Sequence, residues 1–450
     1  MSAAGATRLA AARAAGLDYF SLAAVDWQGR LRAKQLQLAA LPAAFADGVA
    51  FTSAIFATDS AERPIASSRF QDPANGYRDA LLAAGGEAVY GDPFGAAPES
   101  LLVLGSLVDA HRAFCPRAIL QREIDALRAL GFTAFGAFEY ECHLLEETPQ
   151  SLLAKTPAQL GALPELGRMY SWVDQSLRAS WFEDLRGAAL RAGCPVESLH
   201  AEFSGLMEAA LAPAEGMAIA DRAVLFKALC KTVARRHGLL AVFMARLADH
   251  LESAGAHLNL SLRAQAAPAF AAADAPFGVS DVLRRFVGGL QRYTPALTLL
   301  HLPHLNSYKR FCGTSFAPRA NLWGIDNKTC AWRVVTVTAA QTRIECRLPG
   351  ADAPPHLALA AVLAAGRRGL EEALDPGPPC ACDAAQSPPG GPPFPLRFEQ
   401  AIAAWRGSGF ARETFGADFV DAYAESREWQ LELLRARVTD FDLQQFAEGA

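Results

Sequence analysis

The sequence predicts an α+β fold, because it contains two clearly different apolar patterns. Segments 138–142, 258–262 and 342–347 alternate apolar with polar residues, which is typical of strands that bury one face. Residues 221–238 instead place apolar side chains along one face of a helix and end on Gly238, a common helix terminator. Strands and helices of this kind in one chain predict packed α and β layers.

The first part of the chain is expected to form a small α+β domain over residues 1–110. Residues 1–17 are Ala-rich and amphipathic, which predicts an N-terminal helix. Residues 19–34 predict a hairpin whose turn contains Gly29. Residues 100–105 form an apolar run that predicts a short buried strand.

The second part, residues 111–450, is expected to form the larger domain. A helix is predicted from Pro116 to Leu130, and residues 150–194 are expected to be mostly helical. A Pro- and Gly-rich segment at 374–396 predicts a loop inside this domain, and helices are expected after it.

Composition excludes several kinds of partner. The 450-residue chain has a net charge of -5 and no basic tract, which argues against a nucleic-acid partner. Its apolar runs are too short to span a bilayer, so we expect no membrane partner. The nine cysteines are scattered without metal-ligand spacing, and the N-terminus does not resemble a secretory signal. We therefore expect a reduced, cytoplasmic protein.

Two carboxylates, Glu139 and Glu141, lie two positions apart in an otherwise apolar segment. On a strand both side chains point to the same face. Like charges held together raise each other's pKa unless a cation lies between them, so the pair predicts a divalent metal such as Mg²⁺. The alternative is an edge strand with one solvated face, which is the more frequent meaning of an isolated Glu-x-Glu.

Three further groups of polar residues occur in apolar surroundings. A structural histidine or a solvated ladder of ion pairs would explain any one group alone. A sheet curved around a funnel would instead gather all of them beside the Glu139 pair. The groups are Glu202 with Glu208, His257 with Asn259 and Ser261, and Arg343 with Glu345 and Arg347.

Such a funnel predicts phosphoryl transfer. Crowded carboxylates need cations, and arginines bind anionic substrates through two parallel hydrogen bonds. Metals, arginines and anions together are typical of reactions that depend on positioning and charge neutralisation. The sequence contains neither a phosphate-binding P-loop motif nor a dinucleotide fingerprint, so metals and arginines would have to hold a nucleotide.

Residues 306–310, Asn-Ser-Tyr-Lys-Arg, resemble a signature of the glutamine synthetase family. Segments 220–244, 255–262 and 343–349 occur around it in the family's order, and the resemblance extends to 438–441. It implies an N-terminal β-grasp-like domain, followed by a glutamine synthetase-type catalytic domain with a curved antiparallel sheet flanked by helices. It also implies a homo-oligomeric ring with active sites at the subunit interfaces.

The same resemblance implies ATP as a substrate and two or more Mg²⁺ or Mn²⁺ ions per active site. In the family, the Glu-x-Glu strand supplies one ligand to each of two ions. The implied ligands are Glu141, Glu202 and Glu208 for one ion, and Glu139, His257 and Glu345 for the ion that bridges the ATP phosphates.

Further roles carry over by position. The implied catalytic residues are Arg310, Arg333 and Arg347, and Glu202 is the candidate base. The implied substrate contacts are Tyr170, Gly255, Asn259, Arg310, Phe316, Lys328 and Arg347, and the implied nucleotide contacts are Ser261 and Arg333.

One departure from the family redirects the predicted reaction. Phe316 occupies the position where true glutamine synthetases place a Glu that closes over the ammonium site. A phenyl ring removes that negative charge and forms an apolar wall, although a loop residue packing on its neighbours is the alternative. The chain therefore resembles the glutamate–amine (γ-glutamyl-amine or polyamine) ligase branch. We expect ATP-dependent ligation of the γ-carboxylate of glutamate to a small organic amine, through a γ-glutamyl phosphate.

Other departures leave alternatives open. Lys328 stands at an expected Arg, Glu202 and Glu208 are one residue closer than usual, and His356 replaces a Tyr expected near the nucleotide. The alternatives are a glutamine synthetase that uses ammonium, a ligase that uses a different carboxylic acid, and a catalytically silent structural homologue.

Overall fold

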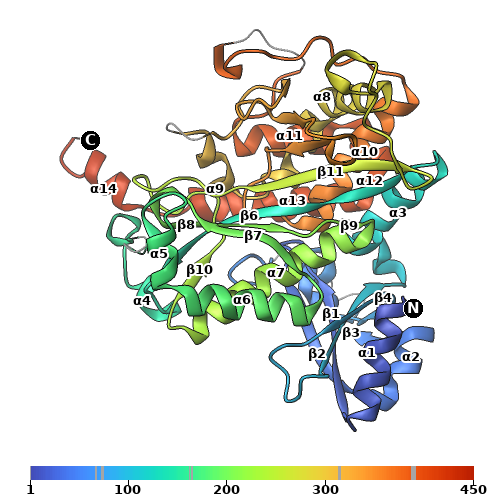
Figure 1. Cartoon of the computed structure of the whole chain (residues 1–450). Helices are drawn as coiled ribbons and strands as arrows, with labels where there is room; N and C mark the ends of the chain where they lie inside the picture. The colour runs from blue at the N-terminus through green and yellow to red at the C-terminus, as the bar shows by residue number, and fades with distance from the viewer. Residues whose placement is uncertain are drawn as a thin grey trace.

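The computed structural model describes residues 2–65, 68–71, 76–161, 163, 166–312, 316–386 and 392–449. Within these residues the strands form one sheet of five and one of ten strands (Figure 1). The predicted mixture of strands and helices is confirmed. No helix in the described ranges is long and apolar enough to cross a membrane.

The smaller sheet has the strand order β2-β1-β5-β4-β3. The predicted hairpin is present, and Gly29 adopts a positive φ of 69° in its turn. A Cβ on Gly29 would come within 2.9 Å of Pro355, so this turn packs closely against the start of a helix far along the chain. The elements are α1 (Ala3–Ala14), β1 (Tyr19–Val25), β2 (Leu31–Gln37), α2 (Leu41–Ala46), β3 (Val49–Phe51), β4 (Ala80–Gly91) and β5 (Leu101–Leu107).

The larger sheet crosses the middle of the molecule in the order β13-β14-β15-β11-β6-β8-β7 (Figure 1). Its pairs along this order are antiparallel except for β13 and β14, which run parallel. The strands are β6 (Thr133–Leu145), β7 (Val196–Ala201), β8 (Leu206–Leu211), β11 (Ala256–Ala264), β13 (Trp323–Ile325), β14 (Trp332–Val335) and β15 (Arg343–Cys346), with short additions at β9 (Ala214–Glu215), β10 (Leu240–Val242) and β12 (Ala267–Pro268).

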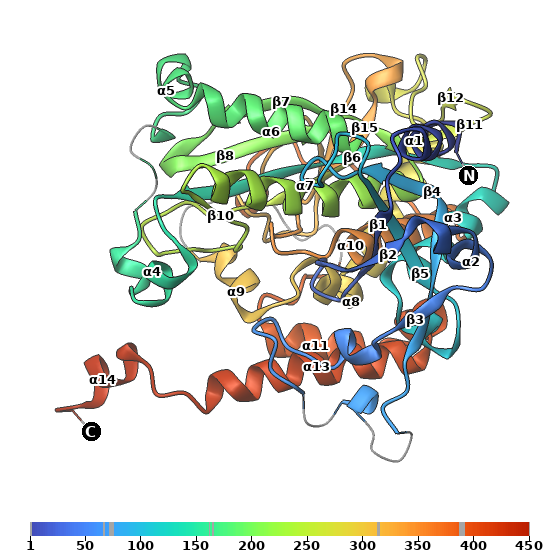
Figure 2. The ribbon, with the colours of Figure 1, turned by 90° about the horizontal axis from the view of Figure 1, so that it is seen from below.

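Strand β6 separates an apolar face from a polar one. Phe138, Tyr140 and Cys142 are buried on one face, and the Tyr140 ring stacks on Phe226 of α7. Glu139 and Glu141 therefore project from the opposite face, as their spacing predicts. Helix α7 (Met217–Arg236) lies between the two sheets, where it packs on β6 and, with α6, against the N-terminal sheet (Figure 2).

The remaining helices cover the larger sheet and extend to the C-terminus. The predicted helix at Pro116 is confirmed, but residues 154–161 and 166–171 contain no α-helix, so 150–194 is less helical than expected. Pro157 and Gly161, two residues that disfavour helix, lie in the first of these non-helical stretches. Of the expected loop, residues 387–391 lie outside the described part. The helices are α3 (Pro116–Ala129), α4 (Pro149–Leu153), α5 (Trp172–Leu177), α6 (Ala179–Ala192), α8 (Asp281–His301), α9 (Leu305–Tyr308), α10 (Pro355–Glu371), α11 (Phe398–Gly407), α12 (Gly409–Phe415), α13 (Ala417–Arg435) and α14 (Asp440–Phe446).

A buried ionic group joins the N-terminal sheet to the helices around the larger sheet. The Arg117 guanidinium donates two hydrogen bonds of 2.9 Å to the Asp221 carboxylate. Tyr90 of β4 and His356 of α10 contact the same carboxylate, at 3.3 and 2.8 Å. His356, at the position where the family has a Tyr near the nucleotide, is fully buried in this group. The group links β4, α3, α7 and α10.

Candidate active site

Strand register brings the polar residues of the sequence analysis together on one face of the larger sheet. His257 of β11 lies opposite Glu139 of β6, and Glu141 of β6 lies opposite Glu208 of β8. Arg333 of β14 lies opposite Glu345 of β15. Residues paired across neighbouring strands have Cβ atoms close enough for their side chains to interact. Five strands therefore contribute to one polar surface.

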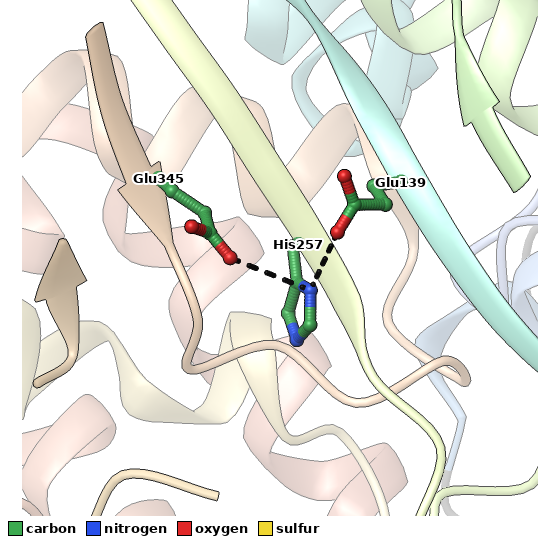
Figure 3. A group of neighbouring side chains, drawn as sticks. All are labelled: Glu139, His257 and Glu345. Atoms are coloured by element: carbon green, nitrogen blue, oxygen red, sulfur yellow. Dashed lines mark hydrogen bonds and ion pairs between the residues drawn. The ribbon is translucent and has the colours of Figure 1, made fainter. Parts of the chain in front are cut away.

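The first cluster contains Glu139, His257 and Glu345, which come from three adjacent strands (Figure 3). The Nδ1 atom of His257 lies 3.1 Å from a Glu139 oxygen and 3.6 Å from a Glu345 oxygen. Each residue offers one ligand atom within 4.8 Å of the others. The family resemblance implied the same three residues as ligands of the ion that bridges the ATP phosphates.

Positive neighbours hold the Glu345 carboxylate in its charged form. Burial alone would raise its pKa, but His257, Arg347 and Arg333 together lower the pKa of Glu345 to about 2. The Nη1 atoms of Arg333 and Arg347 both donate to this carboxylate, the former at 2.6 Å. Glu345 is therefore an ionised oxygen ligand at neutral pH, and two guanidinium groups lie beside it.

The second cluster contains His200, Glu202 and Glu208, again with ligand atoms within 4.8 Å of one another. The Nε2 atom of His200 lies 2.9 Å from Glu202 and 3.5 Å from Glu208. The Tyr170 ring stacks on His200 with 4.2 Å between the ring centres. Burial and then the charges of Glu139 and Glu141 raise the pKa of Glu208 to about 9. Such crowding favours a bound cation, which would restore the charged form.

Glu141 lies opposite Glu208 and also contacts the start of β11. One Glu141 oxygen accepts a hydrogen bond from the backbone N–H of Gly255, and His200 lies with Glu202 and Glu208. A Cβ on Gly255 would come within 2.9 Å of both Arg310 Nη2 and His257 Nε2, and within 3.1 Å of Glu141. Glycine at position 255 therefore lets these three groups approach one another.

The histidine of the second cluster was missed in the sequence analysis. His200 lies two positions before Glu202, so the two side chains share one strand direction. The same alternation that singled out Glu139 and Glu141 could have found it.

The other expected residues lie in different surroundings. Arg310 is buried and donates from Nη1 to the Leu348 and Pro349 carbonyls at 2.8 Å each. Asn259 accepts a hydrogen bond of 2.8 Å from Arg343, and Ser261 is buried on the same strand.

Two other expected residues are exposed. Lys328 is exposed and lines a groove that also contains Arg333. Phe316 is 69% exposed.

The donor atoms fit hard divalent cations. Each cluster combines two carboxylates with one imidazole, a set that suits Mg²⁺ or Mn²⁺ better than a thiol-binding metal. Arginines beside one cluster add binding groups for anionic oxygens. The arrangement can thus bind phosphates and neutralise charge that develops during their transfer.

Comparison with known proteins agrees with this geometry. Residues 113–446 match the family model described as "Glutamine synthetase, catalytic domain". A glutamate–isopropylamine ligase from a Pseudomonas species is 29% identical over 96% of this chain and 95% of its own length. A gamma-glutamylethanolamide synthetase from Streptomyces coelicolor is 34% identical over 74% of this chain and 71% of its own length.

Solved structures share the fold. Ligand-free GmaS superimposes with a TM-score of 0.83 at 24% identity, over 98% of this chain and 99% of the other. A structure described as a novel glutamine synthase homolog gives 0.79 at 26% identity, over 94% and 96% of the two chains. The fold is thus of the glutamine synthetase type. With its catalytic-domain match covering well over half of its length, this chain belongs to the glutamine synthetase family.

Proposed function

We propose that this protein is an ATP-dependent ligase that joins the γ-carboxylate of glutamate to an organic amine. Family membership supports the ligase chemistry, and the names of two relatives, which act with isopropylamine and ethanolamine, support an organic amine. Phe316 is the observation that favours an organic amine over ammonium, because an apolar ring offers no negative charge to an ammonium ion. Glutamate and ATP are the other two substrates.

The reaction consists of two transfers. A γ-carboxylate oxygen of glutamate attacks the terminal phosphorus of ATP, ADP leaves, and a γ-glutamyl phosphate forms. The neutral amine then attacks the acyl carbon, phosphate leaves with the C–O electron pair, and the amine nitrogen loses a proton. Holding both substrates side by side removes much of the entropic cost of each step.

The two clusters have separate roles in this proposal. Glu139, His257 and Glu345 would hold one divalent cation for the ATP phosphates. Glu202 and Glu208 would hold a second, with Glu141 or His200 as the third ligand. When bound, these ions neutralise phosphate charge.

Residues around the clusters bind and orient the substrates. Arg333 and Arg347 lie beside Glu345 and share the charge of the transferred phosphoryl group. Arg310 binds the acid's carboxylate, and Glu202 accepts the proton of the amine. We further assign Tyr170, Gly255, Asn259, Phe316 and Lys328 to the substrates, and Ser261 with Arg333 to the nucleotide.

The arrangement of the whole protein is also part of the proposal. We infer a β-grasp-like domain over 1–110, supported by its five-stranded sheet, and a catalytic domain over 111–450. We infer a homo-oligomeric ring, supported by α14, which extends from the body with Phe441 and Phe446 exposed (Figure 2). Nine cysteines without a disulfide are consistent with a reduced, cytoplasmic location.

The proposed function is tested by phosphate release from ATP with Mg²⁺, glutamate and a panel of amines. We expect turnover with at least one alkylamine or alkanolamine at a higher kcat/KM than with ammonium. Equal or better use of ammonium would show that the Phe316 argument is wrong. Turnover only with another acid would identify a different ligase, and no turnover with any pair would identify a silent homologue.

Phe316→Glu is expected to shift the choice of nucleophile toward ammonium. A carboxylate at this position restores a charged acceptor, and a hydrogen bond to a charged group contributes about 1.5–3 kcal/mol. The ratio of kcat/KM for ammonium to that for the best amine should rise about tenfold or more. Phe277→Glu is the matched control, because Phe277 is also an exposed phenylalanine and lies outside the site. An unchanged ratio in Phe316→Glu would remove Phe316 from the amine site.

A further inference from the structure

A large cavity lies behind the active-site sheet. It has a volume of about 1000 Å³ and opens between α7, the β1–β2 turn, α9 and α13. The Lys227 ammonium on its wall lies 5.5 Å from the centre of the Tyr140 ring. Tyr140 alternates with Glu139 and Glu141 along β6, so the cavity and the metal clusters lie on opposite faces of one strand.

The walls of this cavity carry an excess of positive charge. The chain has six lysines and 36 arginines, yet three of the lysines, Lys227, Lys231 and Lys309, line this one cavity. Arg235 adds a further charge, and Asp352 is the one carboxylate among the described lining residues. Within the described ranges, Lys231, Lys309 and Arg235 make no ion pair with a carboxylate. Most of the charge is therefore uncompensated.

The surroundings of Lys227 disfavour its positively charged form. Its side chain is buried, and its Nζ donates to the Ala351 carbonyl at 2.7 Å without an ion pair to any described carboxylate. Burial and then the neighbouring Lys231 lower the pKa of Lys227 to about 7. An anion bound nearby would oppose the lowering of the Lys227 pKa, because it would add negative charge to that of Asp352.

We propose that this cavity is a binding site for a small organic anion that carries two or more negative groups. Lys227, Lys231, Lys309 and Arg235 would contact these groups, which are phosphates or carboxylates. Apolar side chains, among them Val242, Phe243 and Leu305, line the rest of the cavity and suit the carbon skeleton of such a ligand. The site is separate from the ligase site of the proposed function and does not depend on it.

The segment that lines this cavity also supports the active site. Lys309 faces the cavity, and the next residue, Arg310, reaches toward Gly255 on the catalytic side. Ser307 donates a hydrogen bond of 2.7 Å to the cavity carboxylate of Asp352. A ligand bound to Lys309 would therefore contact the same segment that positions Arg310.

The test is calorimetric titration of the metal-free, full-length protein with pyrophosphate and, separately, with citrate. The variant Lys231→Gln/Lys309→Gln removes two exposed charges from the cavity and should fold normally, which its melting temperature will verify. Lys34→Gln/Lys155→Gln is the matched control, because it removes the same charge elsewhere on the surface. We expect saturable binding of one or both anions per chain, weakened about tenfold or more only by the cavity variant.

Each outcome decides the proposal. Binding of pyrophosphate alone identifies a phosphorylated ligand, and binding of citrate alone identifies a polycarboxylate. Equal affinity in the wild type and the cavity variant would place the anion elsewhere, for example at the nucleotide site, and overturn the proposal. Equal losses in both variants would show a general charge effect, and no saturable binding of either anion would also overturn it. None of these results depends on ligase turnover.

Discussion

Glu345→Gln is expected to lower kcat for ATP-dependent amide formation by about 100-fold or more. The substitution keeps the shape of the side chain and removes the charge. The wild-type carboxylate lies 3.6 Å from His257 and accepts hydrogen bonds from Arg333 and Arg347. Gln would replace one of the two acceptor oxygens with an amide donor that faces an arginine, and would leave the metal cluster without an anionic ligand. Steady-state phosphate release measures the loss, and titration with Mn²⁺ should show weaker binding at one site.

Glu215→Gln is the control for this result. Glu215 is an exposed carboxylate at the edge of the same sheet, paired with Arg263 at 3.0 Å. A surface ion pair of this kind contributes little, so activity should stay within about twofold of the wild type. Full activity in Glu345→Gln would exclude this residue from the catalytic site and with it the assignment of the first cluster.

Asp221→Asn is expected to destabilise the folded protein by about 3 kcal/mol or more. The Asp221 carboxylate is buried with Arg117, and the two share two hydrogen bonds of 2.9 Å. Asn would leave the Arg117 guanidinium buried without an opposite charge, which costs more than the lost contact alone. Because this group joins β4 to three helices, the loss should appear as a lower midpoint of thermal unfolding for the whole protein.

The effect of Asp221 should also depend on pH. Burial opposes ionisation, but Arg117 and His356 lower the pKa of Asp221 far below its ordinary value. A carboxyl with a lowered folded-state pKa stabilises the protein above its unfolded pKa of about 3.9, and this contribution disappears as the pH falls below that value. The difference in unfolding midpoint between wild type and Asp221→Asn should thus be full at pH 7 and shrink below about pH 4.

Asp184→Asn serves as the matched control. Asp184 is an exposed aspartate paired with His237 at 2.8 Å, so its loss should change the unfolding midpoint little at any pH. An Asp221→Asn variant as stable as the wild type at pH 7 would mean that the buried arginine finds another partner.

The local pattern of apolar and polar residues was sufficient to predict many of the strands and helices. Alternation along 138–142 and 258–262 predicted β6 and β11, and the apolar face of 221–238 predicted α7. Alternation assigns side chains to a strand face without knowledge of its neighbours. The start of α7 was predicted four residues too late, at 221 instead of Met217, because Gly216 marks the N-terminus and no polar cap does.

The candidate site was predictable only in part. The family resemblance groups Glu139, His257 and Glu345 as ligands of one ion, and the structure brings these three side chains together. The prediction for the second cluster names Glu202 and Glu208 but omits His200. The closeness of His200 to Glu208 depends on the register between β7 and β8, which places these two residues opposite each other. Register follows from the packing of both strands, which no single segment encodes.

The sequence by itself determined the α+β class, the faces of the main strands and the types of residue proposed to contact ATP, metal and amine. Each of these follows from short-range periodicity or from a motif of a few residues. Tertiary structure alone decided that Glu141 turns toward Gly255, that His356 is buried beside Asp221, and that three lysines line one cavity. These contacts join segments far apart in the chain, so they depend on how sheets and helices pack, and packing is a property of the whole fold.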